Sequence, residues 1–337
     1  MRWSNLDARQ AAEATLHGYR DAVVRHFDAP EALDTRFYEV HAKSALNRVP
    51  KASRVPFRWT INPYRGCSHA CRYCFARPTH TYLGFDAGRD FEQEIVVKVN
   101  VPEVLRAELR RPSWAREHVA MGTNTDPYQW VEGRYRLMPG IWEALRDTRT
   151  PASVLTKSPL LLRDLELMKE LGEVAEVSAN LSVPTLDEKA WRATEPHTPH
   201  PRARLEAVAE LNRAGIPTGV LAAPLMPGIN DAPEQVEALL AAADDAGAAG
   251  IGGIALHLRG ETRGVFMDWL RSARPDLVPR YERLYARGAY APPAERRRLA
   301  ALLRRPGTSS PSRFDRGDES EASAPTPRPE AIQERLF

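Results

Sequence analysis

The sequence predicts an α/β protein built on a parallel βα barrel. From Phe57 onward, apolar strand segments alternate with amphipathic helical segments, which is typical of a parallel sheet in a βα barrel or a doubly wound fold. Polar residues follow several different strands, as in "GTNTDPYQ", "TKSP" and "PLMPGIND". Barrels place chemistry at the carboxyl ends of many strands, whereas doubly wound sheets gather it at one crevice. The spread therefore favours the barrel.

The individual elements follow from local patterns. Apolar runs predict strands over residues 57–61, 94–99, 118–123, 152–157, 174–183, 217–225 and 251–258. Helices are expected from Pro102 and over residues 138–147, 159–172, 204–215 and 232–247. Proline suits the first position of a helix, and the glycines at 172, 215 and 247 suit helix ends.

Three regions are expected along the chain. Residues 1–56 form an N-terminal extension, with helical composition and spacing over residues 8–27. Residues 57–305 form the barrel and its C-terminal helices, and residues 306–337, rich in Pro, Ser and acidic side chains, are expected to be disordered. No run of about eighteen apolar residues and no apolar signal core is present, so a cytoplasmic protein is expected.

The overall charge is uninformative about nucleic acid. A net charge of +3 is only mildly basic. The Arg-rich run over residues 294–306 is interpreted as the solvated face of a terminal helix in preference to a phosphate-binding surface.

The three cysteines of the chain are Cys67, Cys71 and Cys74. Structural zinc usually takes four protein ligands, while disulfides take pairs. Iron–sulfur clusters are held by thiolates, normally four, so three would leave one iron open to a substrate or cofactor. The alternatives are zinc with His69 or His80 as a fourth ligand, and buried cysteines that bind no metal.

The motif "CSHACRYCF" resembles the signature of the radical S-adenosylmethionine (radical SAM) enzymes, including the aromatic Tyr73 before the last cysteine. The resemblance implies a [4Fe–4S] cluster on the three cysteines, with S-adenosylmethionine chelated to the open iron. One-electron cleavage would then give a 5′-deoxyadenosyl radical that abstracts hydrogen from a substrate, with electrons from a flavodoxin- or ferredoxin-type donor. It also implies a partial (β/α)6 TIM-type barrel, which leaves one of the seven expected strands to spare.

Further motifs, "TNTDPYQ", "TKSP" and "TEPHTPHPRARLEAVAELNRAGIP", resemble the branch that contains spore photoproduct lyase and its uncharacterised relatives. In that branch a serine after strand two, a lysine after strand three and a serine on strand four contact the cofactor. The resemblance carries these roles to Asn124 or Thr125, to Lys157 and to Ser178.

The residue types at the strand ends suit S-adenosylmethionine. Its carboxylate needs a cation, which Lys157 offers, and its ammonium and ribose need hydroxyl, amide or carboxylate partners. Such partners occur at the end of the third expected strand and directly after it, at Thr123, Asn124, Thr125 and Asp126. Ser178, Asn180 and Ser182 alternate, which places them on one strand face. The alternatives are turn-forming residues, a surface lysine and serines bonded to the backbone.

One further loop has two possible roles. The loop over residues 224–231 could close over the adenine, or Asp231 could cap the next helix.

Spore photoproduct lyase uses a further cysteine as hydrogen donor, and this chain has no fourth cysteine, which puts a thiol-dependent thymine-dimer reaction and any auxiliary cluster in doubt. Tyr128 is the candidate donor in its place, with a packed tyrosine as the alternative.

The C-terminal peptide "QERLF" resembles the motif by which bacterial polymerases and repair proteins dock on the DNA sliding clamp. Its expected contacts are Gln333, Leu336 and Phe337, presented on a flexible tether. The alternatives are a tail that folds back on the barrel and a chance match.

Together these features predict a radical SAM enzyme whose substrate is unknown and could be DNA or a nucleobase. Two other functions stay open. One is the same chemistry on a small molecule or a protein side chain, and the other is a metal-stabilised nucleic-acid-binding module without activity.

Overall fold

The computed structural model describes residues 8–27, 34–53 and 55–304. The expected tail over residues 306–337 lies outside them. So do Gln333, Leu336 and Phe337, and the sliding-clamp peptide therefore stays a prediction.

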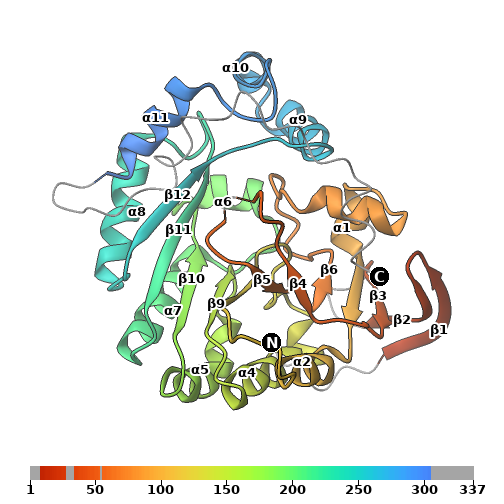
Figure 1. Ribbon diagram of the computed structural model, residues 1–337. Helices are drawn as coiled ribbons and strands as arrows, with labels where there is room; N and C mark the ends of the chain where they lie inside the picture. Colours follow the sequence, from red (N-terminus) through yellow and green to blue (C-terminus); the bar gives the residue numbers. More distant parts are fainter. Residues whose placement is uncertain (1–7, 28–33, 54, 305–337) are drawn as a thin grey trace.

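A partial barrel forms the body of the protein (Figure 1). Within the described residues, six parallel strands run in the sheet order β12-β11-β10-β9-β8-β5, and β4 (Leu46–Arg48) adds antiparallel to β5. The sheet does not close, since β12 and β4 are its two edges. The parallel strands are β5 (Trp59–Ile61), β8 (Val119–Met121), β9 (Ala152–Thr156), β10 (Val177–Ser182), β11 (Thr218–Leu225) and β12 (Ile251–Ala255). The predicted (β/α)6 barrel is confirmed.

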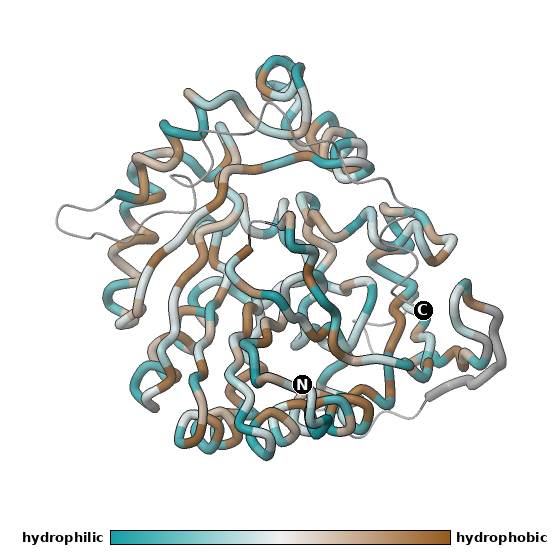
Figure 2. Tube along the Cα trace, in the orientation of Figure 1, coloured by the Kyte–Doolittle hydropathy of each residue, from teal (hydrophilic) through white to brown (hydrophobic). Residues whose placement is uncertain are grey.

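Amphipathic helices cover the outer face of this sheet (Figure 1). Their apolar sides and the outward side chains of the strands form one large core, in which Trp142 and Ile141 of α4 are fully buried. In Figure 2 the apolar colour runs along the strands and recurs on the helices, as burial of one helix face requires. These helices are α2 (Val101–Leu109), α4 (Leu137–Asp147), α5 (Leu165–Gly172), α7 (Pro201–Arg213) and α8 (Pro233–Asp245).

Short helices occupy the carboxyl-end loops, and more helices follow β12. The loop helices are η3 (Arg77–Leu83), α1 (Arg89–Gln93), α3 (Glu132–Tyr135), η4 (Pro159–Asp164) and α6 (Glu188–Thr194). After β12 come α9 (Thr262–Ala273), η5 (Pro275–Leu277), α10 (Val278–Leu284) and α11 (Pro293–Leu302). The expected helix over residues 159–172 is thus split, because Ser158 accepts a hydrogen bond from Leu160 N and starts a 3-10 turn.

A second sheet, β1-β2-β3-β7-β6, lies beside the barrel. It contains β7 (Glu94–Lys98), β3 (Arg36–Val40) and β6 (Tyr64–Arg65). The prediction that residues 94–99 form a barrel strand is therefore wrong. All five residues of β7 are buried, so its apolar run resembles a barrel strand, yet it pairs with β3 and β6. β7 is therefore the one of the seven expected strands that the six-stranded barrel does not contain.

The predicted N-terminal helix is also wrong, because residues 8–27 form a hairpin of β1 (Ala8–Leu16) and β2 (Tyr19–Phe27). Gly18 takes a φ of 82° at the turn between the two strands. Pairing of β2 with β3 extends the sheet, and this tertiary context overrides helical composition. Since β3 also pairs with β7, the extension is joined to the rest of the protein by backbone hydrogen bonds.

The helices after β12 form an apolar wall against the loop that follows β6. One buried cluster joins Phe266 and Leu270 of α9 and Tyr281 of α10 to Cys71 and Tyr73. In α11, Arg298 pairs with Asp231 and Glu295, so part of the Arg-rich run is used in holding α11 to the barrel. No helix in the described part of the chain is long and apolar enough to cross a bilayer.

Candidate active site

The cysteine loop begins at Gly66, directly after β6. Gly66 has a φ of 78°, and a Cβ there would lie 2.9 Å from Ile95 Cδ1 and 3.1 Å from His80 Cε1. The amide of Cys67 donates to the carbonyl of Phe91 at 2.9 Å. Close packing against β7 and η3 therefore fixes where the loop starts.

Arg77, a residue that the sequence analysis did not assign, holds the centre of this loop. Its guanidinium is completely buried and donates to the carbonyls of Cys71 at 2.9 Å, Ala87 at 3.0 Å and Gly88 at 2.8 Å. It also pairs with Glu92 at 2.5 Å. One planar group thus satisfies several buried acceptors, which is a geometry specific to arginine.

Two other side chains hold the ends of the loop. Gln129, fully buried before α3, accepts from Ser68 N at 3.0 Å and donates to the Gly66 carbonyl at 3.2 Å. Thr262 of α9 donates its hydroxyl to the carbonyl of Cys74 at 3.1 Å. The loop is therefore fixed from three directions, and its thiols are held in place before any ligand binds.

The three thiols lie in surroundings that suit a cationic cluster. Cys67 and Cys71 are buried and Cys74 is half-buried. Burial raises the pKa of the Cys74 thiol to about 11 and that of Cys71 well above its ordinary value. A positively charged occupant is what converts such buried thiols to thiolates.

Among the described residues, no three His, Cys, Asp or Glu side chains are placed to share one metal ion. Each thiolate of a cubane cluster binds a different iron, so three sulfurs need not converge on one point. The two histidines of the zinc alternative have other neighbours, and both ring nitrogens of His80 are buried without a hydrogen-bond partner among the described residues. His69 Nδ1 lies 3.4 Å from Asp126 Oδ2, and His80 stacks on Phe85 with ring centroids 5.2 Å apart.

The turn after β8 is built around Asp126. Its Oδ1 accepts from the Thr156 hydroxyl at 2.6 Å, and its Oδ2 accepts from Lys157 N at 2.8 Å and faces His69. Burial raises the pKa of this carboxyl, but His69 and these hydrogen bonds outweigh it and lower the pKa overall. Asp126 therefore connects β8, β9 and the cysteine loop, and its oxygens are used within the protein.

The other predicted residues of this turn differ in placement. Thr125 is buried and donates its hydroxyl to the Tyr64 carbonyl at 2.8 Å, which is a structural role. Thr123 and Asn124 are half-buried beside it, at the carboxyl end of β8. Thr123 and Asn124 are therefore the residues of this turn that remain candidates for contact with the cofactor.

Gly122 makes this turn sterically possible, and its replacement by alanine is expected to destabilise the protein by about 4 kcal/mol or more. A Cβ at Gly122 would lie 1.8 Å from the carbonyl oxygen of Leu155, and its φ is 76°. The control is Gly215→Ala, where φ is 84° but no atom lies within 4 Å. That change is expected to cost about 1 kcal/mol. Equal urea midpoints for the two variants would contradict the steric argument.

Lys157 lies at the end of β9 in a buried charged network. Its Nζ is 3.1 Å from Glu195 Oε1, contacts the Ser182 hydroxyl, and lies 5.7 Å from the ring centroid of Tyr73. The Tyr73 hydroxyl donates to the same Glu195 carboxylate. Lys157 is thus a held cation beside the cysteine loop, and the alternative of a free surface lysine is excluded.

Glu195 and Arg204 complete this network, and the sequence analysis assigned neither. Both are fully buried, with Arg204 Nη2 2.7 Å from Glu195 Oε2 and Arg204 Nη1 2.8 Å from the Ser182 carbonyl. Burial raises the pKa of Glu195, but Arg204 and Lys157 outweigh it and lower the pKa to about 2. The signal was present in the quoted "TEPHTPHPRAR" segment, where no role had been assigned to these two residues.

The polar residues of β10 share one face, as the alternation predicted. Val177, Ala179 and Leu181 are buried in the outer core, whereas Ser178 and Asn180 are half-buried on the other side. Gly219 of β11 leaves space for Asn180, whose Oδ1 lies 2.7 Å from the position of an added Cβ. Ser178 and Asn180 therefore face the barrel interior.

Tyr128 is placed as a packed tyrosine, the alternative that the sequence left open. Its hydroxyl donates to Asp164 at 2.9 Å and accepts from Trp142 Nε1 at 2.7 Å inside the outer core. Burial and the Asp164 carboxylate raise its pKa well above the ordinary value. The described structure therefore offers this hydroxyl no path to a substrate.

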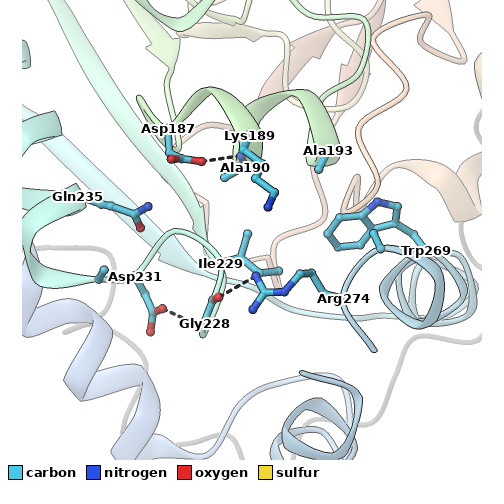
Figure 3. A pocket seen from close by; sticks show the side chains of 12 residues that line it. Asp187, Lys189, Ala190, Ala193, Gly228, Ile229, Asp231, Gln235, Trp269 and Arg274 are labelled. Carbon is cyan, nitrogen blue, oxygen red and sulfur yellow. Dashed lines mark hydrogen bonds between the residues drawn. The ribbon is translucent and has the colours of Figure 1, made fainter. Parts of the chain in front are cut away.

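The loop after β11 is held by its own side chains. Asp231 accepts from Gly228 N at 2.5 Å instead of capping α8, whose N-cap is Ala232, so the predicted cap is wrong. A cavity of about 420 Å³ lies between this loop, α6 and α9. Figure 3 shows Lys189 pointing into it from α6, opposite Ile229 and Arg274. The cavity adjoins the carboxyl ends of β10 and β11, since α6 and Gly228 directly follow these strands.

A family model for the radical SAM superfamily matches residues 61–251, which span the cysteine loop and the barrel up to the start of β12. The chain belongs to the radical SAM superfamily. It is therefore an enzyme of the radical SAM class, and membership implies a [4Fe–4S] cluster, S-adenosylmethionine and a reductant.

Relatives of this radical SAM chain include uncharacterised proteins. One from Mycobacterium tuberculosis is 51% identical over 304 residues, covering 89% of each chain. Another, from Acidianus two-tailed virus, is 29% identical and covers 64% of this chain and 71% of its own. Similarity at this length places the chain in a group with a common fold.

Solved structures of spore photoproduct lyase share the fold. The lyase complexed with dinucleoside spore photoproduct has a TM-score of 0.57 at 16% identity, covering 79% of this chain and 77% of its own. A cysteine-to-serine mutant of that lyase has a TM-score of 0.55 at 18% identity, with 77% and 76% covered. The expected relation to this branch is confirmed at the level of the fold.

Proposed function

We propose that Cys67, Cys71 and Cys74 hold a [4Fe–4S] cluster with one iron open to S-adenosylmethionine. When bound, such a cluster supplies the electron that breaks the S–C5′ bond and so yields a 5′-deoxyadenosyl radical, which abstracts hydrogen from the substrate. The observation that carries the proposal is the position of Lys157, a half-buried cation that pairs with buried Glu195 and lies over the Tyr73 ring, beside the loop that carries the three thiols.

The side chains around the thiols have distinct tasks in this proposal. Lys157 binds the carboxylate of the methionine part, and Glu195 holds Lys157 and Tyr73 in position. Ser178 and Asn180 face the interior and bind the ribose hydroxyls, and Asn124 or Thr123 binds the methionine ammonium. The apolar wall of α9 and α10 excludes water from the side of Cys71.

A nucleobase in DNA is the substrate we propose. The lyase of similar fold was solved with a dinucleoside photoproduct, which supports this class of substrate. The cysteines of this chain are all in the loop, and Tyr128 is packed in the core, so the reaction does not end on a further thiol or on that tyrosine. The same chemistry on a small molecule or a protein side chain is the alternative.

Anaerobic reconstitution with iron and sulfide tests the proposal. We expect about four irons per chain and a broad absorbance band at about 400 nm. Dithionite should then release 5′-deoxyadenosine from S-adenosylmethionine, and a DNA oligonucleotide that carries the substrate base should increase the yield. Each Cys→Ser variant should lose the band and the product.

The matched control is Ser68→Ala, which changes a non-ligand residue of the same loop and keeps the backbone contact of Ser68 with Gln129. It should retain the absorbance band. A colourless wild-type protein with one bound zinc and no 5′-deoxyadenosine would contradict the proposed chemistry.

A further inference from the structure

Two exposed aromatic rings lie beside the third cysteine and a histidine. Among the described residues, the exposed large hydrophobic side chains are Phe75 (53%), Tyr290 (36%) and Val174 (44%). Phe75 directly follows Cys74, and its ring centroid is 6.0 Å from that of His257. The His257 centroid is in turn 5.8 Å from that of Tyr290. We call Phe75, His257 and Tyr290 the aromatic platform.

The platform joins two parts of the chain that are distant in sequence. Phe75 belongs to the loop after β6, whereas His257 follows β12, so their ring contact brings together loops near the first and last parallel strands, which do not pair with each other. Tyr290 is held there by an antiparallel bridge to His257, and Leu258 N donates to the Ala289 carbonyl at 2.7 Å. The backbone therefore fixes two of the rings at this edge.

The geometry leaves ring faces available to a ligand. The platform rings are tilted against one another, by 55° and 48°, so none covers a neighbour's whole face. His257 Nδ1 is buried without a hydrogen-bond partner among the described residues, and burial and Arg259 lower the pKa of this ring to about 4. His257 is therefore a neutral ring with an unused polar atom. A purely structural cluster would bury its rings and satisfy that nitrogen.

One arginine lies on the platform, and the segment that carries His257 and Tyr290 is rich in arginine. The Arg259 guanidinium lies 4.9 Å from the Tyr290 ring centroid. Between residues 257 and 291 the chain carries seven arginines against four carboxylates. Three of these arginines form ion pairs with carboxylates in the described structure, while Arg259, Arg263, Arg283 and Arg287 do not. This charge is complementary to phosphate.

We propose that the aromatic platform stacks an unpaired nucleobase of a DNA strand, with Arg259 on the neighbouring phosphate. Aromatic faces with adjacent arginine are how proteins bind single-stranded nucleic acid, because each unstacked base offers a π-face to a ring. The inference rests on the proposed function, since it places the base next to Cys74, at the mouth of the site where the radical is formed. A base inside a duplex cannot reach such a platform until it is unpaired.

The test uses the reconstituted holoenzyme under anaerobic conditions and a fluorescein-labelled DNA 12-mer, single-stranded or duplex, read by anisotropy. Phe75→Leu and Tyr290→Leu are each expected to weaken single-strand binding roughly tenfold. Arg259→Gln should reduce the slope of log K for DNA binding against log salt concentration by the amount expected for about one phosphate contact. The matched control is Val174→Ala, an exposed apolar residue before β10 and so at the opposite end of the barrel, which should bind DNA like wild type.

A second readout, the KM for S-adenosylmethionine in dithionite-driven cleavage without DNA, separates the two proposals. The platform is supported if the fold-loss of DNA affinity in these variants is at least five times the fold-rise in this KM. A rise in KM with unchanged DNA affinity would mean that the platform stacks the cofactor's adenine, and would overturn the inference. Tighter binding of the duplex than of the single-stranded 12-mer would overturn the inference as well. So would an aromatic peptide that, without any DNA, binds the platform in place of the labelled 12-mer.

The two proposals fail in different ways. A wild-type enzyme that releases 5′-deoxyadenosine but does not bind the 12-mer would contradict the platform and leave the proposed chemistry standing. A protein that binds the 12-mer through Phe75 but never releases 5′-deoxyadenosine would contradict the proposed chemistry.

Discussion

Replacing Arg77 with methionine is expected to destabilise the protein by about 4 kcal/mol and to prevent cluster assembly. The change would leave the carbonyls of Cys71, Ala87 and Gly88 buried without their donor, and would remove the buried one of the two arginines that pair with Glu92. Each buried acceptor without a partner costs about 1–3 kcal/mol, so loss of the methylene packing is the smaller effect. Urea unfolding and iron content after reconstitution measure the two consequences.

Arg72→Met is the matched control for Arg77→Met, since Arg72 pairs with the same carboxylate, Glu92, at 3.2 Å but is half-buried. It should cost no more than about 1 kcal/mol and should still take up iron. Arg77→Lys keeps the charge but not the fork of donors, so it should resemble methionine more than arginine. Full iron content in Arg77→Met would show that the loop holds its shape without this residue.

The cysteines were predictable because their information is local. Three thiols within eight residues, with glycine before them, form a motif that can be recognised without any knowledge of the surrounding fold, and it lies in the segment that the family model matches. Arg77 is equally close in sequence, but its role depends on carbonyls ten and eleven residues further along the chain. Sequence patterns show that an arginine is present and do not show which acceptors it will reach.

In the fold, too, local sequence patterns do not specify which distant segments will pair. Alternating strands and helices predicted the barrel, since that pattern determines a parallel sheet. The apolar run of β7 could not be distinguished from a barrel strand, because a fully buried strand looks alike in either sheet. The choice was made by pairing with β3, which lies in the N-terminal extension, where no strand had been predicted.

Asp126 shows why site residues are harder to predict than elements. A carboxylate directly after a barrel strand is typical of a ligand contact. The structure uses both of its oxygens to join Thr156, Lys157 and His69. Glu195, by contrast, meets Tyr73 from 122 positions away, and no local pattern predicts that contact.

Replacing Glu195 with glutamine is expected to raise the KM for S-adenosylmethionine about tenfold or more and to destabilise the protein by about 3 kcal/mol. Glutamine keeps the shape and can still accept from Tyr73, but Arg204 and Lys157 would lose their buried counter-charge. Lys157 would then be held less firmly at the position that we assign to the methionine carboxylate. The matched control is Glu188→Gln in α6, the helix that Glu195 directly follows, where the pair with Arg192 is exposed and neither KM nor the urea midpoint should change.

The pH dependence of stability tests the charge of Glu195 separately from its shape. The folded pKa is lowered to about 2 from an ordinary 4.5, so ionisation favours the folded state. This contribution, about 3 kcal/mol, is fully present above pH 4.5 and is lost progressively as the pH falls toward 2. The difference in unfolding free energy between wild type and Glu195→Gln should therefore be constant from pH 7 to about 5 and shrink below 4.5. A difference that stays constant down to pH 3 would mean that the destabilisation comes from altered packing and not from the loss of a buried carboxylate.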